Sequence, residues 1–155
     1  MDFLWDTNLL IHKIRKSWSF EIWNNQHKFF DSGNRNFISI VSVGEISSIA
    51  LQRNWGDKKM KILQNTLNQL SSLPIAKRNI IEAYSRIDAY SQGKLKGKLL
   101  PKKMTARNMG KNDLWIAATA KVINAKLVTT DKDFQHLNDT FFEVIELEFP
   151  LKDEF

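Results

Sequence analysis

Residues 113–134 of the chain read DLWIAATAKVINAKLVTTDKDF, and this stretch decides the predicted fold. Its first half, 113–124, is apolar almost all round, which predicts a helix buried in a core. The second half begins with KLVTT at 126–130, which is short and rich in β-branched residues and so predicts a strand. A buried helix that leads within a few residues into a strand is typical of α/β proteins.

The rest of the chain alternates between the same two kinds of segment. Apolar residues at helical spacing predict helices, and short apolar runs predict strands. Further strands are expected at 2–6, 36–41, 73–76 and 143–147, and helices at 8–16, 19–30, 43–54, from 57 onward, and after 76 to about 91. Because strands and helices alternate, the sequence predicts an α/β fold with a mostly parallel sheet of five strands.

The composition is that of an ordinary soluble globule, with 43% hydrophobic and 26% charged residues in a chain of 155. We expect a single domain over residues 1–155, since domains of this size are common. Cysteine is absent, which excludes disulfides, zinc thiolate sites, iron–sulfur clusters and cysteine nucleophiles. No apolar run reaches the roughly 18–20 residues of a membrane helix, and no basic region precedes an apolar stretch at the N-terminus. We therefore expect a cytoplasmic protein without a membrane segment.

The net charge of +6 is spread unevenly along the chain. Residues 131–155 hold eight acids and two bases, so the remaining body of the chain is strongly basic. A basic body favours a polyanionic partner such as RNA or DNA. The alternative is a flexible loop that its charges merely keep solvated. The densest basic stretch, with no acid in it, contains Lys94, Lys96, Lys98, Lys102, Lys103, Arg107 and Lys111.

Four acids occupy related places in the predicted elements. Asp6 closes the first strand, Glu45 lies in the first turn of the helix after the second strand, and Asp131 follows the strand at 126–130. The carboxyl ends of parallel strands lie on one edge of a sheet, so these three side chains are expected to approach one another. Asp113 opens a helix that does not follow a strand, and its arrival at the same edge is a separate assumption.

Each acid taken alone also has a structural explanation. The SVGE segment at 42–45 has the pattern of a helix capping box, and TDKD at 130–133 is a second candidate. Asp113 would interact favourably with a helix dipole, with Asn112 as an alternative N-cap. Asp6 begins a sequence that is typical of a turn before a helix.

Taken together, the acids point to a metal ion. Several carboxylates that converge without nearby bases raise one another's pKa and destabilise the fold unless a cation lies between them. Hard oxygen ligands suit Mg²⁺ or Mn²⁺. Such an ion binds a phosphate and generates a hydroxide near neutral pH, and a basic surface attracts the polyanion. The sequence thus predicts metal-dependent hydrolysis of phosphodiester bonds.

Four segments in register also resemble a known family. These are DTNLLI at 6–11, ISIVSVGEI at 38–46, NDLWIAATA at 112–120 and LVTTDKDF at 127–134. They resemble the PIN domain, most closely the VapC toxins of type II toxin–antitoxin pairs. The resemblance implies a three-layer PIN-like fold and an endoribonuclease that depends on Mg²⁺ or Mn²⁺. It also implies tRNA or ribosomal RNA as substrate, a homodimer, and a cognate antitoxin protein as partner.

The resemblance assigns roles to individual residues. The four acids of the family fall on Asp6, Glu45, Asp113 and Asp131, which would form the catalytic metal site with Asp6 as the central ligand. In the family Asp113 lies at the same sheet edge as the others. The supporting positions fall on Thr7, Asn8, Thr129 and the additional acid Asp133. The segment from about 91 to 111 departs from the family by being longer and more basic, and we expect its basic residues to contact RNA phosphates.

Two alternatives to a toxin remain open. One is a PIN-type nuclease that processes RNA without being a toxin, and the other is a non-catalytic RNA-binding or interaction module whose acids only cap helices. A receiver domain or a haloacid-dehalogenase-like phosphatase fits poorly, because the first site reads Asp-Thr-Asn at 6–8. His12, His27 and His136 show no metal-binding spacing and are expected at surface or half-buried positions.

Overall fold

Five parallel strands form one sheet in the computed structural model, which describes residues 1–151. The strand order is β3-β2-β1-β4-β5, and every neighbouring pair is parallel. The strands are β1 (Asp2–Trp5), β2 (Arg35–Ser39), β3 (Ser71–Leu73), β4 (Lys126–Thr129) and β5 (Val144–Glu146). The predicted α/β fold with a five-stranded parallel sheet is confirmed. The last residues of the expected domain, 152–155, lie outside the described residues.

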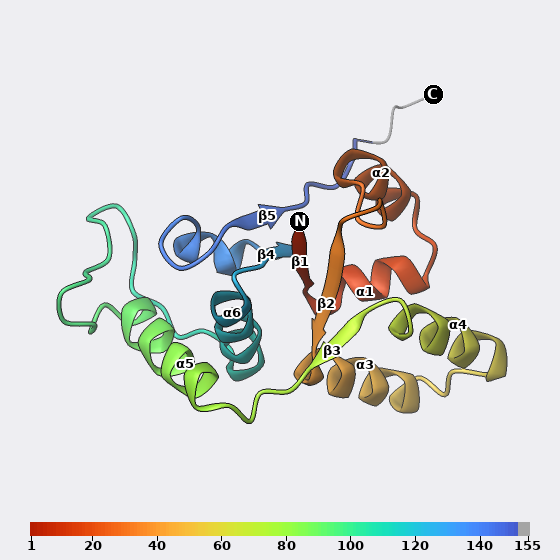
Figure 1. The fold of residues 1–155 in the computed structure, drawn as a ribbon, viewed down its shortest axis with the longest axis horizontal. Coiled ribbons are helices and arrows are strands. Elements are labelled where there is room, and N and C mark those ends of the chain that lie inside the picture. The colour runs from red at the N-terminus through yellow and green to blue at the C-terminus, as the bar shows by residue number, and fades with distance from the viewer. Residues whose placement is uncertain (152–155) are drawn as a thin grey trace.

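Helices cover both faces of the sheet (Figure 1). They are α1 (Thr7–Ile14), α2 (Trp18–His27), α3 (Ile40–Gln52), α4 (Asp57–Leu67), α5 (Arg78–Ser91) and α6 (Lys111–Ile123), with a 3₁₀ helix, η1 (Lys132–Leu137). The pair α5 and α6 lies on one side, and α1 to α4 lie on the other. This gives the predicted three layers. None of these helices is long and apolar enough to span a membrane.

The central strand β1 joins the two cores because its side chains alternate between the faces of the sheet. Phe3 and Trp5 pack into the core beneath α1 to α4, whereas Leu4 packs into the core beneath α5 and α6. All three side chains are fully buried. The one polar atom of Trp5 is satisfied by a hydrogen bond of 3.0 Å from its Nε1 to Asn36 Oδ1. A strand buried on both faces holds its carboxyl end, and hence Asp6, in a fixed place.

The second strand is shorter than predicted, and the helix after it begins earlier. Strand β2 ends at Ser39, whose hydroxyl accepts a hydrogen bond from the Val41 amide and so caps α3. The predicted strand 36–41 is therefore wrong in its last two residues. Glu45 lies in the second turn of α3, not the first. Ser42 is buried inside the helix, so the capping box proposed for 42–45 does not form.

The edge strand is displaced from its predicted position. Strand β3 covers 71–73 and pairs with β2, whereas the sequence predicted 73–76. Pro74 ends the pairing because proline has no amide hydrogen to donate. Ile75 then leaves the sheet and lines a cleft beside α3.

Candidate functional site

The structure brings the four predicted acids to one edge of the sheet. Asp6 and Asp131 follow β1 and β4 directly, and Glu45 projects from α3, which follows β2. Asp113 lies in the first turn of α6. It is close enough to the other three for their charges to raise its pKa. The assumption that Asp113 reaches this edge therefore holds.

Asp6 is the most deeply buried member of the cluster, with 4% of its surface exposed. Its Oδ1 accepts a hydrogen bond of 2.7 Å from the Thr7 amide, which caps α1. Its Oδ2 accepts a bond of 2.7 Å from the Thr129 hydroxyl. A carboxylate oxygen has two lone pairs, so each oxygen of Asp6 keeps one for a further partner. Capping a helix and binding a cation are therefore compatible for this residue.

Two threonines link Asp6 to its neighbours. The hydroxyl of Thr7 donates to Glu45 Oε1 at 3.0 Å, and the hydroxyl of Thr129 accepts from the Asp131 amide at 2.9 Å. Both threonines are buried. The network fixes the orientation of the carboxylates through residues that carry no charge. The third predicted supporting residue, Asn8, is exposed and forms no hydrogen bond to the acids within residues 1–151.

Asp131 caps the 3₁₀ helix η1. Its Oδ1 accepts a bond of 2.9 Å from the Asp133 amide, which leaves Oδ2 without a partner in the helix start. The side chain of Asp133 is exposed, and its charge adds to the repulsion that raises the pKa of Asp113. The capping role suggested for 130–133 thus belongs to Asp131, and it occupies one of the two carboxylate oxygens.

Burial and mutual repulsion both act on the cluster. The pKa of Asp6 is raised to about 6, mainly by burial and also by the charges of Glu45 and Asp131, against the lowering effect of the hydrogen bonds from Thr129 and Thr7. Burial likewise raises the pKa of Asp113 to about 6, with added repulsion from the other acids. All the charges that act on these two pKa values are carboxylates. A cation at this place would relieve the repulsion.

The donor set fits a hard divalent ion. As the side chains stand, no three acidic or histidine side chains within residues 1–151 converge closely enough to coordinate one ion directly. Mg²⁺ keeps several of its waters and is usually bound through one or two carboxylates. Asp6, with a free lone pair on each oxygen, and one further acid would satisfy that requirement.

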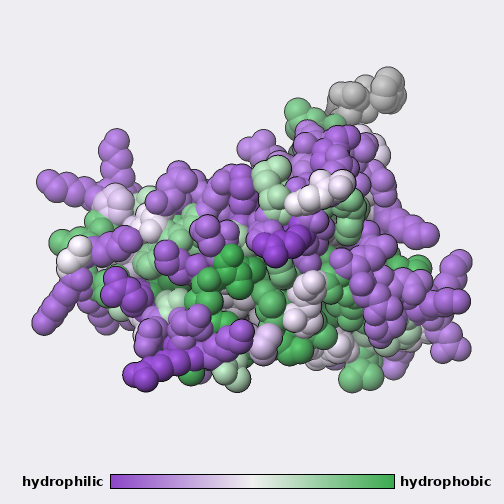
Figure 2. Space-filling model, viewed as in Figure 1, coloured by the Kyte–Doolittle hydropathy of each residue, from purple (hydrophilic) through white to green (hydrophobic). Residues whose placement is uncertain are grey.

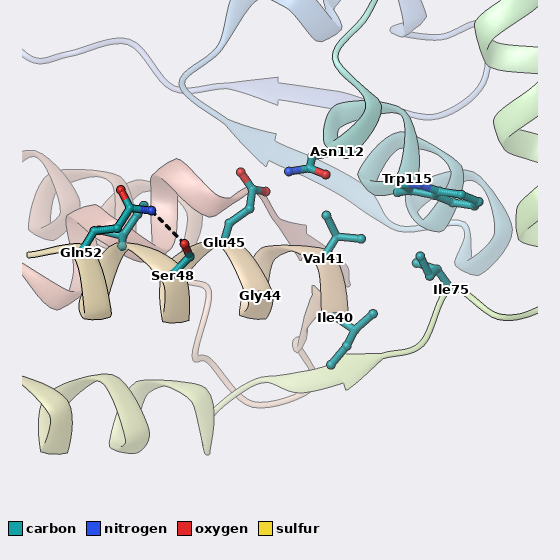
Figure 3. A pocket seen from close by; sticks show the side chains of 10 residues that line it. Ile40, Val41, Gly44, Glu45, Ser48, Gln52, Ile75, Asn112 and Trp115 are labelled. Atoms are coloured by element: carbon teal, nitrogen blue, oxygen red, sulfur yellow. Dashed lines mark hydrogen bonds between the residues drawn. The ribbon is translucent and has the colours of Figure 1, made fainter.

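Two hollows flank the cluster. A cleft of about 670 Å³ lies between α3 and α6, where Glu45 and Asn112 face each other and Trp115 lies beside Val41 and Ile75 (Figure 3). A second hollow of about 310 Å³ is lined by Asp113 and Asp133 together with residues 105–109 of the basic segment. A linear polymer that crosses the carboxylates would therefore have open space on both sides of the cluster.

The seven predicted basic residues divide into different environments. Lys94, Lys96, Lys102, Lys103 and Lys111 are exposed, whereas Arg107 is half-buried and lines the second hollow. Lys98 donates to the Thr140 carbonyl at 3.1 Å and lies over the Phe141 ring. Lys111 belongs to the first turn of α6 and not to the loop.

His136 is a feature that the sequence reading missed. It was expected at a surface or half-buried position, but it is 3% exposed. Its Nε2 shares a hydrogen bond of 2.7 Å with the hydroxyl of the buried Ser91. Burial lowers the His136 pKa to about 4, helped by the charge of Arg107, so the ring is neutral near pH 7. A lone histidine carries no periodic signal, and only the fold shows this pairing.

The Ser91–His136 pair is expected to stabilise the fold. Replacing Ser91 with alanine leaves a buried imidazole nitrogen without a partner, which costs about 1–3 kcal/mol. Thermal unfolding should show a decrease of several degrees. Ser85→Ala is the matched control, because Ser85 lies on the same helix, is exposed and bonds only to the Ile81 carbonyl. Equal melting temperatures for Ser91→Ala and Ser85→Ala would contradict the role of the pair.

Gly110 leaves room for the Asp113 carboxylate. A Cβ at this glycine would lie 3.3 Å from Asp113 Oδ2, so Gly110→Ala is expected to displace that side chain by a few tenths of an ångström. We expect an activity that depends on Asp113 to fall about 3–10-fold, since a displacement near 1 Å costs about 100-fold. Gly56→Ala is the control, since Gly56 also precedes a helix and has open space around it. Unchanged kinetics for Gly110→Ala would mean that the position of Asp113 is not critical.

The comparisons with known proteins agree with this fold. The sequence profile of the PIN domain matches residues 3–139. A chain of VapBC2 from Rickettsia felis, solved bound to a promoter DNA fragment, is similar with a TM-score of 0.73 and 20% identity, covering 96% of this chain and 100% of that one. A chain of VapBC-1 from nontypeable Haemophilus influenzae is similar with a TM-score of 0.71 and 21% identity, covering 95% and 98%. Curated proteins provide no match.

The fold and the matched profile define the class of protein. The profile covers most of the chain, including all four acids. The chain belongs to the PIN domain family. The structures similar to it include chains of bacterial VapBC toxin–antitoxin complexes.

Proposed function

We propose that this protein is an endoribonuclease that depends on Mg²⁺ or Mn²⁺ and acts as the VapC-like toxin of a toxin–antitoxin pair. The observation that carries the proposal is the buried Asp6, held by Thr7 and Thr129 among three other carboxylates, with no base among the charges of residues 1–151 that shift its pKa. An uncompensated cluster of this kind destabilises a fold, so a cation is the simplest reason for its presence. PIN-domain membership provides the hydrolase chemistry at the level of the family.

The four acids would divide the work of binding and positioning. Asp6 would hold the ion directly, and Asp113 and Asp131 would contact it as a second direct ligand or through the waters that the ion keeps. Glu45, held by the Thr7 hydroxyl, would orient the attacking water or bind a second ion. When bound, the ion would bind the scissile phosphate and lower the pKa of a water. Asp6 is the most deeply buried of the four acids, so it would be the central ligand of the ion.

RNA is the substrate that fits the charge distribution. The overall charge of +6 attracts a polyanion, and the ion would offset the repulsion between the acids and the phosphates. Transfer RNA and ribosomal RNA are the candidates that the resemblance to VapC toxins suggests.

The proposed partners follow from the relatives. Similar chains were solved within complexes named as toxin–antitoxin systems, as in VapBC-5 from Mycobacterium tuberculosis, at 19% identity and a TM-score of 0.58. We propose a cognate antitoxin for this chain on these grounds, and a homodimer and a cytoplasmic location from its resemblance to VapC toxins. Inhibition of RNA cleavage by the product of a neighbouring small gene would support the toxin role. Cleavage without any inhibitory partner would favour the alternative of an RNA-processing nuclease.

The direct test of the proposed reaction uses total cellular RNA. Purified protein is incubated with the RNA in Mg²⁺, and new ends are mapped by sequencing. We expect a few discrete cut sites that disappear when EDTA replaces Mg²⁺. Cleavage of equal extent in EDTA would contradict metal dependence, and no new ends in any metal would favour the non-catalytic RNA-binding alternative.

A further inference from the structure

Residues 92–110, here called the basic arm, connect α5 to α6. In Figure 1 the arm leaves the end of α5, extends beyond the helical layer and returns to the start of α6. Long hydrophilic side chains project from the same region of the molecule in Figure 2. The arm is thus placed to contact a ligand that extends past the carboxylates.

The arm is packed and is not a loose loop. Leu95, Leu100 and Met109 pack against the core beneath α5 and α6. Gly93 adopts a left-handed conformation, with φ of 71°, that turns the chain sharply. A Cβ at Gly93 would lie 3.7 Å from Ala106, so the two legs of the arm lie side by side at its base. Side chains on such a scaffold lose less freedom on binding than side chains on a flexible loop.

The base of the arm is tied to the segment that carries Asp131. The Arg107 amide donates to the Ser91 carbonyl at 2.8 Å. The Ser91 hydroxyl in turn shares its 2.7 Å hydrogen bond with His136, which belongs to η1. Asp131 caps that same 3₁₀ helix. The arm and this part of the acidic cluster therefore form one connected unit.

The lysines along the arm are available for a ligand. Lys94, Lys96, Lys102 and Lys103 are exposed, and none of them forms an ion pair with an acid within residues 1–151. Lys98 is held by Thr140 and is set apart from this group. Arg107 lies nearer the cluster, in the hollow that Asp113 also lines. Arg107 therefore lies beside the acidic cluster, and the four exposed lysines lie elsewhere along the arm.

We propose that the basic arm binds the phosphate backbone of RNA outside the scissile bond, with Arg107 at the inner end and Lys94, Lys96, Lys102 and Lys103 farther out. This inference rests on the proposed function, since it names where the same substrate is held. The lysines lie away from the reacting atoms. Their removal therefore raises KM and leaves kcat nearly unchanged, as expected for uniform binding.

The test measures RNA binding by fluorescence anisotropy in the Asp6→Asn background, which prevents cleavage. The probe is a labelled oligouridylate of about 20 nucleotides, longer than the roughly 4–16 nucleotides of common single-strand sites. The arm variant replaces Lys94, Lys96, Lys102 and Lys103 with alanine. The control variant replaces four lysines that are exposed elsewhere, Lys58, Lys61, Lys77 and Lys121.

The arm variant is expected to lower the salt slope of log K by about 3, since each phosphate contact on a single strand contributes about 0.7. The control variant has the same net charge and should keep a slope close to that of the parent. Equal slopes for parent and arm variant, or equal losses in both variants, would overturn the proposal. Melting curves would establish that each variant is folded.

The outcome separates the arm from the nuclease. If the arm variant binds RNA like its parent while the protein with Asp6 intact cleaves RNA, the arm proposal fails and the nuclease proposal stands. If the protein with Asp6 intact cleaves nothing but the arm variant loses its salt-dependent binding, the nuclease proposal fails and the arm remains a phosphate-binding surface.

Discussion

Asp6→Asn is expected to abolish RNA cleavage while the protein stays folded. The substitution keeps the size of the side chain but removes the charge that would hold the ion. The loss should exceed the roughly 10–100-fold that is typical when residues that only orient a metal ligand are changed. The measurement is the single-turnover cleavage rate on a substrate identified from the mapped RNA ends.

Asp57→Asn provides the matched control. Asp57 is an exposed aspartate in the first turn of α4, and it is not among the charges that act on the pKa values of Asp6 and Asp113. Its replacement should leave the cleavage rate unchanged. If Asp6→Asn cleaves at a rate within a fewfold of wild type, Asp6 is not the central metal ligand.

The second large effect is a reversal of stability between wild type and Asp6→Asn. In metal-free protein at pH 7, Asp6→Asn should be the more stable, because wild type carries an uncompensated buried charge. A pKa raised from 3.8 to about 6 corresponds to a difference of up to about 3 kcal/mol. Excess Mn²⁺ should stabilise wild type by about 4.1 kcal/mol at about 1,000 times its Kd, which exceeds that difference, and leave the variant almost unchanged.

The stability of wild type relative to Asp6→Asn should decrease as the pH rises. Between pH 4 and 6 the folded protein holds the Asp6 proton more tightly than the unfolded chain does, so this group's contribution to stability falls as pH rises. His136 acts in the opposite direction over this range, since its pKa is lowered. Comparing wild type with Asp6→Asn at each pH cancels the His136 contribution. A constant difference in melting temperature from pH 4 to 7 would contradict a raised Asp6 pKa.

Residues that follow strands were predictable from the sequence. The apolar run at 3–5 defines a buried strand, and parallel strands share a carboxyl edge, so Asp6 and Asp131 were expected at the same place. The arrival of Asp113 did not follow from that rule. It depends on the packing of α5 against α6 and on the long return of the basic arm, and sequence periodicity carries no information on either.

The residue that caps a helix was less predictable where two nearby residues could both do so. Ser39 and Ser42 both precede apolar helical residues and both can cap a helix. The structure uses Ser39, because β2 ends its pairing there and Ser42 is buried inside α3. The Ser91–His136 pair joins residues that are 45 positions apart, so no local sequence pattern predicts it.

The most direct test of the central claim is the anomalous signal of Mn²⁺ in crystals grown with that ion. We expect a peak about 2.0–2.6 Å from an oxygen of Asp6 and from an oxygen of at least one of Glu45, Asp113 and Asp131. The peak should be missing from Asp6→Asn crystals grown in the same way. Wild-type crystals with Mn²⁺ bound only elsewhere, or an unchanged peak in Asp6→Asn, would contradict the account.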